Sequence, residues 1–219
     1  MTLYWAQLST AKEDASKVSQ TRELYVIAGP SGGGKTSLFR ALLDRFDHLA
    51  LSVSDTTRPP RATETDGEQY CFIDEATFKA GIDAGRYLEY AQVFGHYYGT
   101  SKDRVQALWD QGQDVILEID IQGAVNIRQR HPEASSIFIL PPSMAVLAQR
   151  LRHRGLDDEA VIARRLSEAK EEIAAARSFD WLVINDDFER AFAELSAIVE
   201  AWPTRCARRL GDIDRLLAE

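Results

Sequence analysis

The segment GPSGGGKT, from Gly29 to Thr36, has the residue types and spacing of a phosphate-binding loop. Its glycines let backbone N–H groups turn toward one point without a Cβ clash, and the helix expected after it adds the partial positive charge of its N-terminus. Lys35 can reach the terminal phosphates of a nucleoside triphosphate, and Thr36 offers a hydroxyl to Mg²⁺. An apolar run precedes the segment and a helical pattern follows it, which favours a triphosphate site over a Gly-rich turn that binds nothing. The residues expected to form this site are Gly29, Pro30, Ser31, Gly32, Gly33, Gly34, Lys35, Thr36 and Ser37.

Two carboxylates, Glu118 and Asp120, close the apolar segment VILEID. A strand that is apolar on both faces lies in the middle of a sheet, and its carboxyl end opens onto the crevice where the phosphate-binding loop is expected. Carboxylate oxygens bind Mg²⁺ directly or through water. Acidic residues at strand ends more often simply face solvent, but the central position favours a metal role, with Thr36 and Glu118 as the expected ligands.

A second phosphate site is indicated by the segment SVSDTTRPPR, which carries Arg58 and Arg61 on either side of a proline pair. Proline fixes φ and stiffens the loop, and the guanidinium group of arginine matches phosphate oxygens in a bidentate manner. Taken alone, the segment is equally consistent with a solvated loop and two surface arginines. Tyr70 and Tyr98 add hydroxyls that suit the rim of a phosphate site, which shifts the balance toward binding.

Glu89 lies in an apolar and aromatic stretch, RYLEYAQVF, without an obvious partner in the sequence. A buried lone carboxylate is costly unless another group donates hydrogen bonds to it. Guanine meets this need, because its N1–H and 2-amino groups are donors, while hydroxyls such as those of Ser54 or Thr100 can donate to its O6. Adenine has an acceptor at N1 and no 2-amino group, so the same carboxylate would repel it. The pattern therefore favours guanine, and the buried polar pairing makes the preference strong.

Strands that alternate with helices are expected to position these residues. Apolar runs predict strands within residues 23–29, 48–54, 114–120, 135–142 and 181–186. Helical periodicity predicts helices within residues 35–46, 101–112, 143–155, 157–179 and 187–202. The alternation predicts an α/β fold with a parallel sheet covered by helices on both faces. The tract from about 55 to 100 breaks the alternation, and we expect an inserted subdomain with short aromatic strands there.

Composition limits the classes of function. The chain has 219 residues, of which 45% are hydrophobic and 27% charged, as in a globular domain. Its net charge of −8 argues against a dedicated nucleic-acid binder, although local arginines can still bind small anions. No apolar run is as long as a membrane span, and Cys71 and Cys206 lack metal-site spacing. Residues 1–21 lack an apolar signal core, so we expect a mobile extension on a cytoplasmic protein.

A family resemblance is carried by seven motifs, which are GPSGGGKT, SVSDTTRPPR, DGEQYCF, YLEYAQVFGHYYGTS, VILEIDIQGA, RLRHRG and INDD. They follow one another in the order seen in guanylate kinases, and the resemblance covers about residues 23–206. It implies a P-loop parallel sheet flanked by helices, an inserted mixed-β GMP-binding subdomain and a helical lid. The implied limits are 1–21 for the extension, 22–206 for the kinase-like domain and 207–219 for a C-terminal helical tail. The subdomain would occupy about residues 55–100 and the lid about 150–167.

The resemblance also implies a reaction, ATP + GMP giving ADP + GDP, by in-line phosphoryl transfer with Mg²⁺ bound to ATP. By matching motifs, the GMP phosphate would be held by Arg58, Arg61, Tyr70 and Tyr98, and the base by Ser54, Glu89, Thr100 and Asp120. Asn185 would contact the adenine of ATP. Most of the five arginines in QRLRHRGLDDEAVIARRL are expected to face solvent, but Arg154 and Arg165 would close on the ATP phosphates. Arg154 and Arg165 are therefore expected to act in catalysis together with Lys35 and Arg58.

Two alternatives remain open from the sequence. One is a guanylate kinase-like module that has lost catalysis and binds phosphorylated peptides, and the intact Lys35, glycines and carboxylates disfavour it. The other is a related kinase of another phosphorylated small molecule, which would not need Glu89 and Ser54 to read a base. The expected partners are ATP and GMP, with dGMP as a further candidate acceptor, and no nucleic acid or membrane. We expect a monomer or a homodimer.

Overall fold

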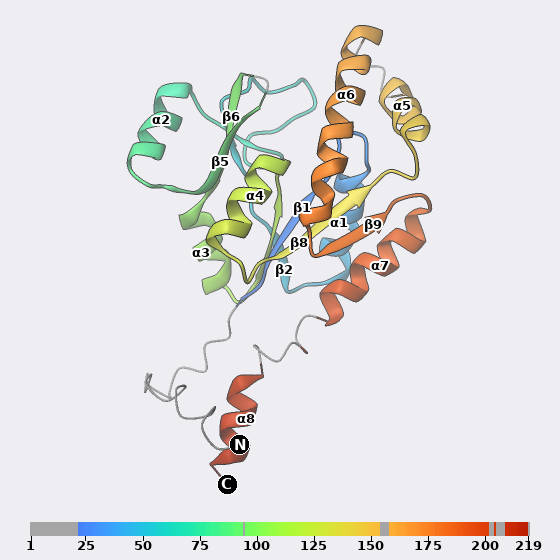
Figure 1. The fold of residues 1–219 in the computed structure, drawn as a ribbon. Helices are drawn as coiled ribbons and strands as arrows, with labels where there is room; N and C mark the ends of the chain where they lie inside the picture. Colours follow the sequence, from blue (N-terminus) through green and yellow to red (C-terminus); the bar gives the residue numbers. More distant parts are fainter. Residues whose placement is uncertain (1–21, 94, 154–157, 202–203, 205–208, 219) are drawn as a thin grey trace, which may run out of the picture. The chain divides into compact units, whose positions relative to one another are not determined.

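A computed structural model describes residues 22–93, 95–153, 158–201, 204 and 209–218 of the protein (Figure 1). One compact unit contains Arg22–Val199, and every described candidate site residue lies in it. The expected N-terminal extension, residues 1–21, lies outside the described residues. The expected C-terminal tail contains helix α8, Leu210–Leu217, which belongs to a separate unit. Among the described residues, no helix combines the length and the apolar character that crossing a membrane requires.

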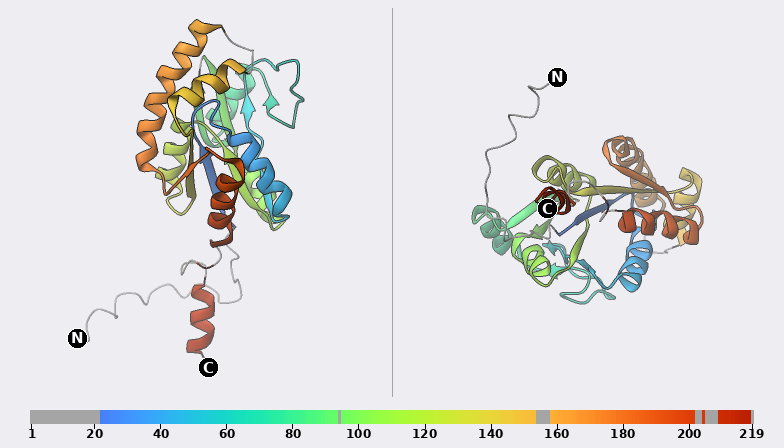
Figure 2. Two further views of the ribbon diagram at one scale, coloured as in Figure 1. Left: turned by 90° about the vertical axis from the view of Figure 1, so that its right-hand side faces the viewer. Right: turned by 90° about the horizontal axis from the view of Figure 1, so that it is seen from below.

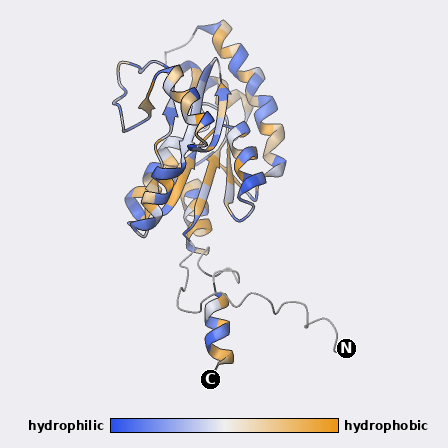
Figure 3. Cartoon of the chain, turned by 90° about the vertical axis from the view of Figure 1, so that its left-hand side faces the viewer, coloured by the Kyte–Doolittle hydropathy of each residue, from blue (hydrophilic) through white to orange (hydrophobic). Residues whose placement is uncertain are grey.

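A five-stranded sheet forms the centre of the larger unit (Figure 1). In the spatial order β2-β7-β1-β8-β9, its strands are Leu49–Leu51, Asp114–Glu118, Leu24–Ala28, Ser135–Leu140 and Trp181–Ile184. Every neighbouring pair is parallel, as the alternating pattern predicts. The central strands β7, β1 and β8 are apolar and almost completely buried, which is typical of parallel strands covered on both faces (Figure 3). Because β1 and β7 run in the same direction, their carboxyl ends open at one edge of the sheet.

Helices cover both faces of this sheet (Figure 2). They are α1, Lys35–Arg45; α3, Lys102–Asp110; α4, Ile121–Arg130; α5, Met144–His153; α6, Glu159–Ala175; and α7, Phe188–Ala201, with a short 3₁₀ turn at Ala176–Ser178. Each is amphipathic: α1 buries Leu38 and Leu42, for example, while its other face meets solvent. A separate apolar cluster, which includes Leu151 of α5 and Ile162 of α6, joins these two helices. The sequence pattern does not predict α4, because IQGAVNIRQR contains a glycine, which weakens the helical pattern.

The tract that breaks the alternation forms a second, four-stranded sheet with one helix. In the order β4-β3-β6-β5, its strands are Cys71–Phe72, Asp55–Thr56, His96–Ser101 and Tyr87–Val93. The β3–β4 pair is parallel, whereas β3–β6 and β5–β6 are antiparallel, so the sheet is mixed. Helix α2, Glu75–Asp83, which the sequence pattern does not predict, packs on this sheet through Phe78, whose ring stacks on Tyr87 at a centroid distance of 4.4 Å.

Candidate active site

The loop between β1 and α1 has a backbone that only glycine supports at two positions. Gly32 and Gly34 have φ angles of 89° and 93°, in the left-handed region that other residues avoid. A Cβ on Gly34 would lie 2.1 Å from the amide nitrogen of Asn185, and one on Gly29 would lie 2.4 Å from the carbonyl oxygen of Ile139. The loop therefore turns tightly into the N-terminus of α1, the geometry that aims backbone N–H groups at an anion.

Lys35 begins α1, and its ammonium group lies along the loop. Its Nζ donates hydrogen bonds to the carbonyl oxygens of Gly29, at 2.7 Å, and Pro30, at 3.3 Å. The side chain also lines the large cavity described below. The cation is thus placed beside the backbone donors of the loop, where both can act on the same phosphate groups.

Thr36 and Glu118 meet although they are far apart in the sequence. The Thr36 hydroxyl donates to Glu118 Oε1 at 3.2 Å, which joins the start of α1 to the end of β7. A hydroxyl and a carboxylate are oxygen ligands of the kind that Mg²⁺ prefers. Within the described part of the chain, no group of three or more His, Cys, Asp or Glu side chains could hold a metal ion by itself. These two residues therefore fit a Mg²⁺ ion that is also held by phosphate oxygens of a substrate, which is how this ion is usually bound.

Asn185 and Arg150 donate hydrogen bonds to the backbone of the phosphate-binding loop. Asn185, at the end of β9, donates from its amide to the carbonyl oxygen of Gly33 at 2.8 Å, and its side chain is buried. Arg150 of α5 donates to the same carbonyl at 3.3 Å and to the carbonyl oxygen of Asn185 at 2.9 Å. A cavity of about 700 Å³ lies here, lined by Gly32, Gly34, Ser37 and Asn185 among others. The sequence reasoning did not identify Arg150, because an arginine on an amphipathic helix usually faces solvent.

One large cavity, of about 920 Å³, brings most of the predicted residues together. It is lined by Gly29, Ser31, Gly32, Gly34, Lys35, Thr36, Ser54, Arg58, Arg61, Tyr70, Glu89, Tyr98, Glu118, Asp120 and Arg165, all of which the sequence predicts. Predicted residues that do not line it are Pro30, Gly33, Ser37, Thr100 and Asn185. The expected catalytic Arg154 lies outside the described residues. The phosphate-binding loop and the segment SVSDTTRPPR, called the arginine loop because it carries Arg58 and Arg61, therefore line the same cavity from two different parts of the fold.

Glu89, on β5, is buried at the wall of this cavity, with 3% of its surface exposed. Thr100 of β6 donates its hydroxyl to Glu89 Oε1 at 2.7 Å. The pKa of Glu89 is raised to about 7, mainly by burial; the nearby charge of Asp120 acts in the same direction, while the hydrogen bonds from Thr100 act in the opposite direction. Burial also raises the pKa of Asp120, whose Oδ1 accepts the Gly123 N–H at 2.8 Å and so begins α4. Burial therefore disfavours the ionised form of Glu89, and further hydrogen-bond donors, such as those of a guanine edge, would stabilise that form.

Gly123 makes room for that carboxylate. A Cβ at this position would lie 2.7 Å from Glu89 Oε2, closer than van der Waals contact allows. The first turn of α4 can approach Glu89 only because residue 123 has no side chain. The sequence reasoning missed this role, since a helical glycine gives no sign of which distant group it faces.

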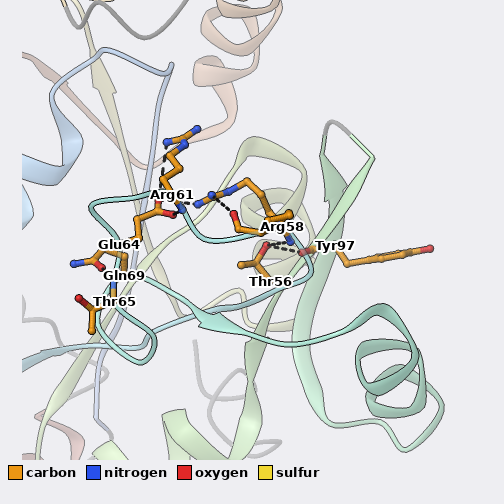
Figure 4. A network of polar contacts seen from close by, with 8 residues as sticks. Thr56, Arg58, Arg61, Glu64, Thr65, Gln69 and Tyr97 are labelled. Carbon is orange, nitrogen blue, oxygen red and sulfur yellow. Dashed lines mark hydrogen bonds and ion pairs between the residues drawn. The ribbon is translucent and has the colours of Figure 1, made fainter.

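The arginine loop is organised by Glu64, which the sequence reasoning also missed (Figure 4). Arg58 donates to Glu64 Oε1 at 2.8 Å, and the backbone N–H of Arg61 donates to Glu64 Oε2 at 2.7 Å. The guanidinium of Arg58 also lies over the ring of Tyr70, 5.4 Å from its centroid. Burial alone would raise the pKa of Glu64, but the hydrogen bonds from Arg58 and Arg61 hold it below its usual value. The hydrogen bond to Glu64 in turn raises the pKa of Arg58, so the pair is ionised at neutral pH.

Helix α6 adds charged groups to the cavity on the side of the phosphate-binding loop. Arg164, Arg165, Glu168 and Glu172 all line it. Burial raises the pKa of Glu172 to about 7, an effect that the charge of Lys35 reduces and that of Asp120 reinforces. The sequence reasoning named Arg165 only, because acidic residues on a polar-faced helix are ordinarily solvated.

Comparisons with known proteins agree on one family. A family model described as guanylate kinase matches residues 21–202. A protein named guanylate kinase from Alkalilimnicola ehrlichii is 52% identical over 196 residues, which are 90% of this chain and 95% of that protein. Another of the same name from Alcanivorax borkumensis is 51% identical over 199 residues, 89% of this chain and 96% of its own. The crystal structure of guanylate kinase from Anaplasma phagocytophilum superimposes with a TM-score of 0.68 at 31% identity, covering 85% of this chain and 89% of that one.

Proposed function

The chain belongs to the guanylate kinase family, and from that premise we propose which of its residues hold ATP, which hold GMP and how the phosphoryl group moves between them. The protein is an enzyme that phosphorylates GMP with ATP, which yields GDP and ADP. The two substrates are both polyanions, so the task of the site is to bring like charges together in line.

The triphosphate of ATP is assigned to the loop before α1. The backbone donors of this loop and the ammonium group of Lys35 surround the β- and γ-phosphates, and Arg165 approaches from α6. Thr36 and Glu118, already joined by a hydrogen bond, would hold the Mg²⁺ that accompanies ATP, which would neutralise phosphate charge when bound. The smaller cavity is assigned to the adenine, since it is lined by Asn185 and shares Gly32 and Gly34 with the large cavity.

GMP is assigned to the part of the large cavity that the second sheet lines. Arg58 and Arg61 would grip its phosphate, with the hydroxyls of Tyr70 and Tyr98 at the rim. Glu89 would accept hydrogen bonds from guanine N1–H and the 2-amino group, with Asp120 beside it. Ser54 and Thr100 would complete the base site. The buried Glu89 supports this assignment most directly, because burial raises its pKa and the N–H donors of guanine would stabilise its ionised form.

In the reaction, a phosphate oxygen of GMP attacks the γ-phosphorus of ATP. A new P–O bond forms as the bond to the bridging oxygen of the β-phosphate breaks, and ADP leaves with that electron pair. No general base is required, because the GMP phosphate has a second pKa near 6 and is mostly a dianion at pH 7. Arg58, Lys35 and Arg165 neutralise charge on the transferring group and on both substrates.

One observation carries this proposal: a single cavity contains Lys35, Arg58 and Glu89, one residue from each expected subsite. The decisive test is titration of GMP, and separately of a non-hydrolysable ATP analogue, into Arg58→Lys. Lysine keeps the charge but loses the planar fork, so GMP affinity should fall on the order of tenfold to a hundredfold while affinity for the analogue is unchanged. Unchanged GMP affinity, or an equal loss for both nucleotides, would refute the assignment of the phosphate clamp.

We also propose a cytoplasmic location and a monomeric or homodimeric state. The location is supported by the two cysteines, which lie far apart in the sequence, and by Cys71, which is a free thiol as expected in a reducing compartment. The net charge of −8 supports small-molecule substrates rather than nucleic acid as partners.

A further inference from the structure

The polypeptide crosses between the two sheets at two places. It leaves the parallel sheet after β2, which ends at Leu51, and enters the second sheet at Asp55, where β3 begins. It returns where β6 ends at Ser101 and α3 begins at Lys102. All residues assigned to GMP except Asp120 lie on the segment between these crossings or at its ends. The geometry of the crossings therefore controls where the GMP site sits relative to the phosphate-binding loop.

Arg104, in the first turn of α3, links one crossing to the other. Its Nη1 donates to the carbonyl oxygen of Val53 at 2.9 Å, in the outgoing crossing. Its Nη2 donates to Asp55 Oδ1, also as an ion pair. Its own backbone N–H donates to the hydroxyl of Ser101 at 3.5 Å, and this hydroxyl caps the start of α3. Arg104 therefore connects the outgoing and the returning crossing, which are the two ends of the inserted segment.

Asp55, the ion-pair partner of Arg104, also accepts a hydrogen bond from a second side chain. Asp55 is 1% exposed, and Tyr87 of β5 donates its hydroxyl to Asp55 Oδ2 at 3.1 Å. Tyr87 is itself buried and stacks on Phe78, which fixes the ring. Each carboxylate oxygen of Asp55 therefore has a donor, and an ion pair satisfied in this way is rigid rather than exchangeable. The brace reaches from α3 into the middle of the second sheet.

Ser54 lies between the two groups that Arg104 holds. Val53 and Asp55 flank it in the chain, and Ser54 also accepts the Cys71 N–H on its own carbonyl oxygen at 2.9 Å. Ser54 lines the large cavity, whereas Arg104 does not. Arg104 is thus outside the reach of substrate but fixes the backbone on both sides of a residue assigned to the base.

We propose that Arg104 is a positioning residue for GMP, which acts by bracing the two crossings through Val53 and Asp55. This inference rests on the proposed function, because it takes the inserted segment to be the GMP site. A brace that served only overall stability would lower the apparent kcat through the amount of folded protein and would leave the KM for both substrates unchanged. A positioning role instead changes the use of GMP in the folded enzyme and leaves the use of ATP unaltered.

The test compares four variants of the full chain by steady-state kinetics with each substrate varied and by calorimetric titration of GMP. Arg104→Ala removes the brace but leaves Asp55 buried without its ion pair, which can reduce folding. The double variant Asp55→Asn/Arg104→Met avoids this, since it removes both charges at similar volume and keeps an acceptor for Tyr87. Arg128→Ala is the matched control, because Arg128 forms an ion pair with Asp180, at 3.6 Å, and lines neither described cavity. Arg58→Lys reports on the GMP site itself.

The proposal predicts that the double variant melts near the parent temperature. Its KM for GMP should be raised on the order of tenfold, which is a usual effect for residues that share one contact network. Its KM for ATP should stay within about twofold, and Arg128→Ala should match the parent. If the folded double variant used GMP like the parent while Arg58→Lys lost GMP, the brace would be refuted and the GMP site retained. If neither variant lost GMP, the assigned site and the brace would both be wrong.

Discussion

At the scale of single residues, the buried carboxylate of Glu89 decides which base the proposed GMP site accepts. Burial raises its pKa to about 7, and among the described residues Thr100 donates a side-chain hydroxyl to it. Guanine offers two adjacent N–H donors of matching geometry. Specificity then arises because any base without those donors leaves a buried acceptor unpaired.

Glu89→Gln tests this residue directly. Glutamine has nearly the same size, but its amide places a donor against the guanine edge. We expect kcat/KM for GMP to fall by the equivalent of roughly 2–4 kcal/mol, the loss of a charged hydrogen-bond pair. Steady-state assays with the KM for ATP as an internal control would measure it. Parent-like kinetics with GMP would show that Glu89 does not read the base.

The raised pKa of Glu89 also predicts a pH dependence. Only the ionised carboxylate accepts both guanine donors, so kcat/KM for GMP should rise as the pH increases through about 7. The GMP phosphate contributes a separate step near pH 6, which any variant retains. The step near pH 7 should vanish in Glu89→Gln. A profile for that variant that still rises through pH 7 would assign the step to another group.

The raised pKa of Glu89 also predicts that the stability of the folded protein falls as the pH rises, whereas kcat/KM for GMP rises. The pKa of Glu89 in the folded protein lies above its ordinary value of 4.5, so the folded state binds the proton more tightly than the unfolded state. Its favourable contribution is complete below about pH 4.5 and is lost as the pH rises to about 7. Thermal unfolding of the parent and Glu89→Gln should therefore show the variant gaining relative stability over this window. A constant difference between them would contradict the shifted pKa.

At the scale of elements, function depends on how the ends of helices and strands meet. The first turn of α4 approaches Glu89 through Gly123, where a Cβ would lie 2.7 Å from the carboxylate. The start of α1 meets the end of β7 through Thr36 and Glu118. These junctions bring groups from distant segments within hydrogen-bond distance, and small changes of backbone there act on substrates rather than on the core.

Gly123→Ala is the corresponding prediction. Alanine suits a helix, and the group that it would meet is the flexible end of a side chain, so the fold should remain intact. The displaced carboxylate should raise the KM for GMP about tenfold or more, because a small misplacement in a positioned site is costly. Gly211→Ala, in α8 with open space around it, is the matched control. Equal kinetics for the two variants would mean that Gly123 has no special role.

The elements also show where sequence reasoning succeeds. The phosphate-binding loop and the buried strands were predicted because each is a local pattern: glycines between a strand and a helix, or an uninterrupted apolar run such as LYVIA. Helices α2 and α4 are not predicted, since each contains a glycine that weakens the helical pattern. The role of Arg104 is not readable from the sequence because its partner Val53 is distant in the chain, whereas Glu64 is close to Arg58 in the sequence but only the folded loop shows that the two pair.

At the scale of the whole molecule, we propose that the parallel sheet positions the groups that bind ATP and that the inserted second sheet positions those that recognise GMP. The two meet at the large cavity, where the phosphate-binding loop and the arginine loop face each other. In this arrangement, backbone groups of the phosphate-binding loop would hold the triphosphate, and side chains of the inserted segment would select the acceptor nucleotide. Selection of guanine by that segment is the central claim.

Turnover of the purified chain with GMP, AMP, CMP and UMP as competing acceptors tests this claim most directly. ADP formation would be followed in a coupled assay with saturating ATP and Mg²⁺, and kcat/KM compared among the four nucleotides. The account predicts that GMP is preferred by at least about a thousandfold, because the other bases leave Glu89 unpaired. Comparable kcat/KM values for GMP and AMP, or no ADP formation with GMP, would contradict it.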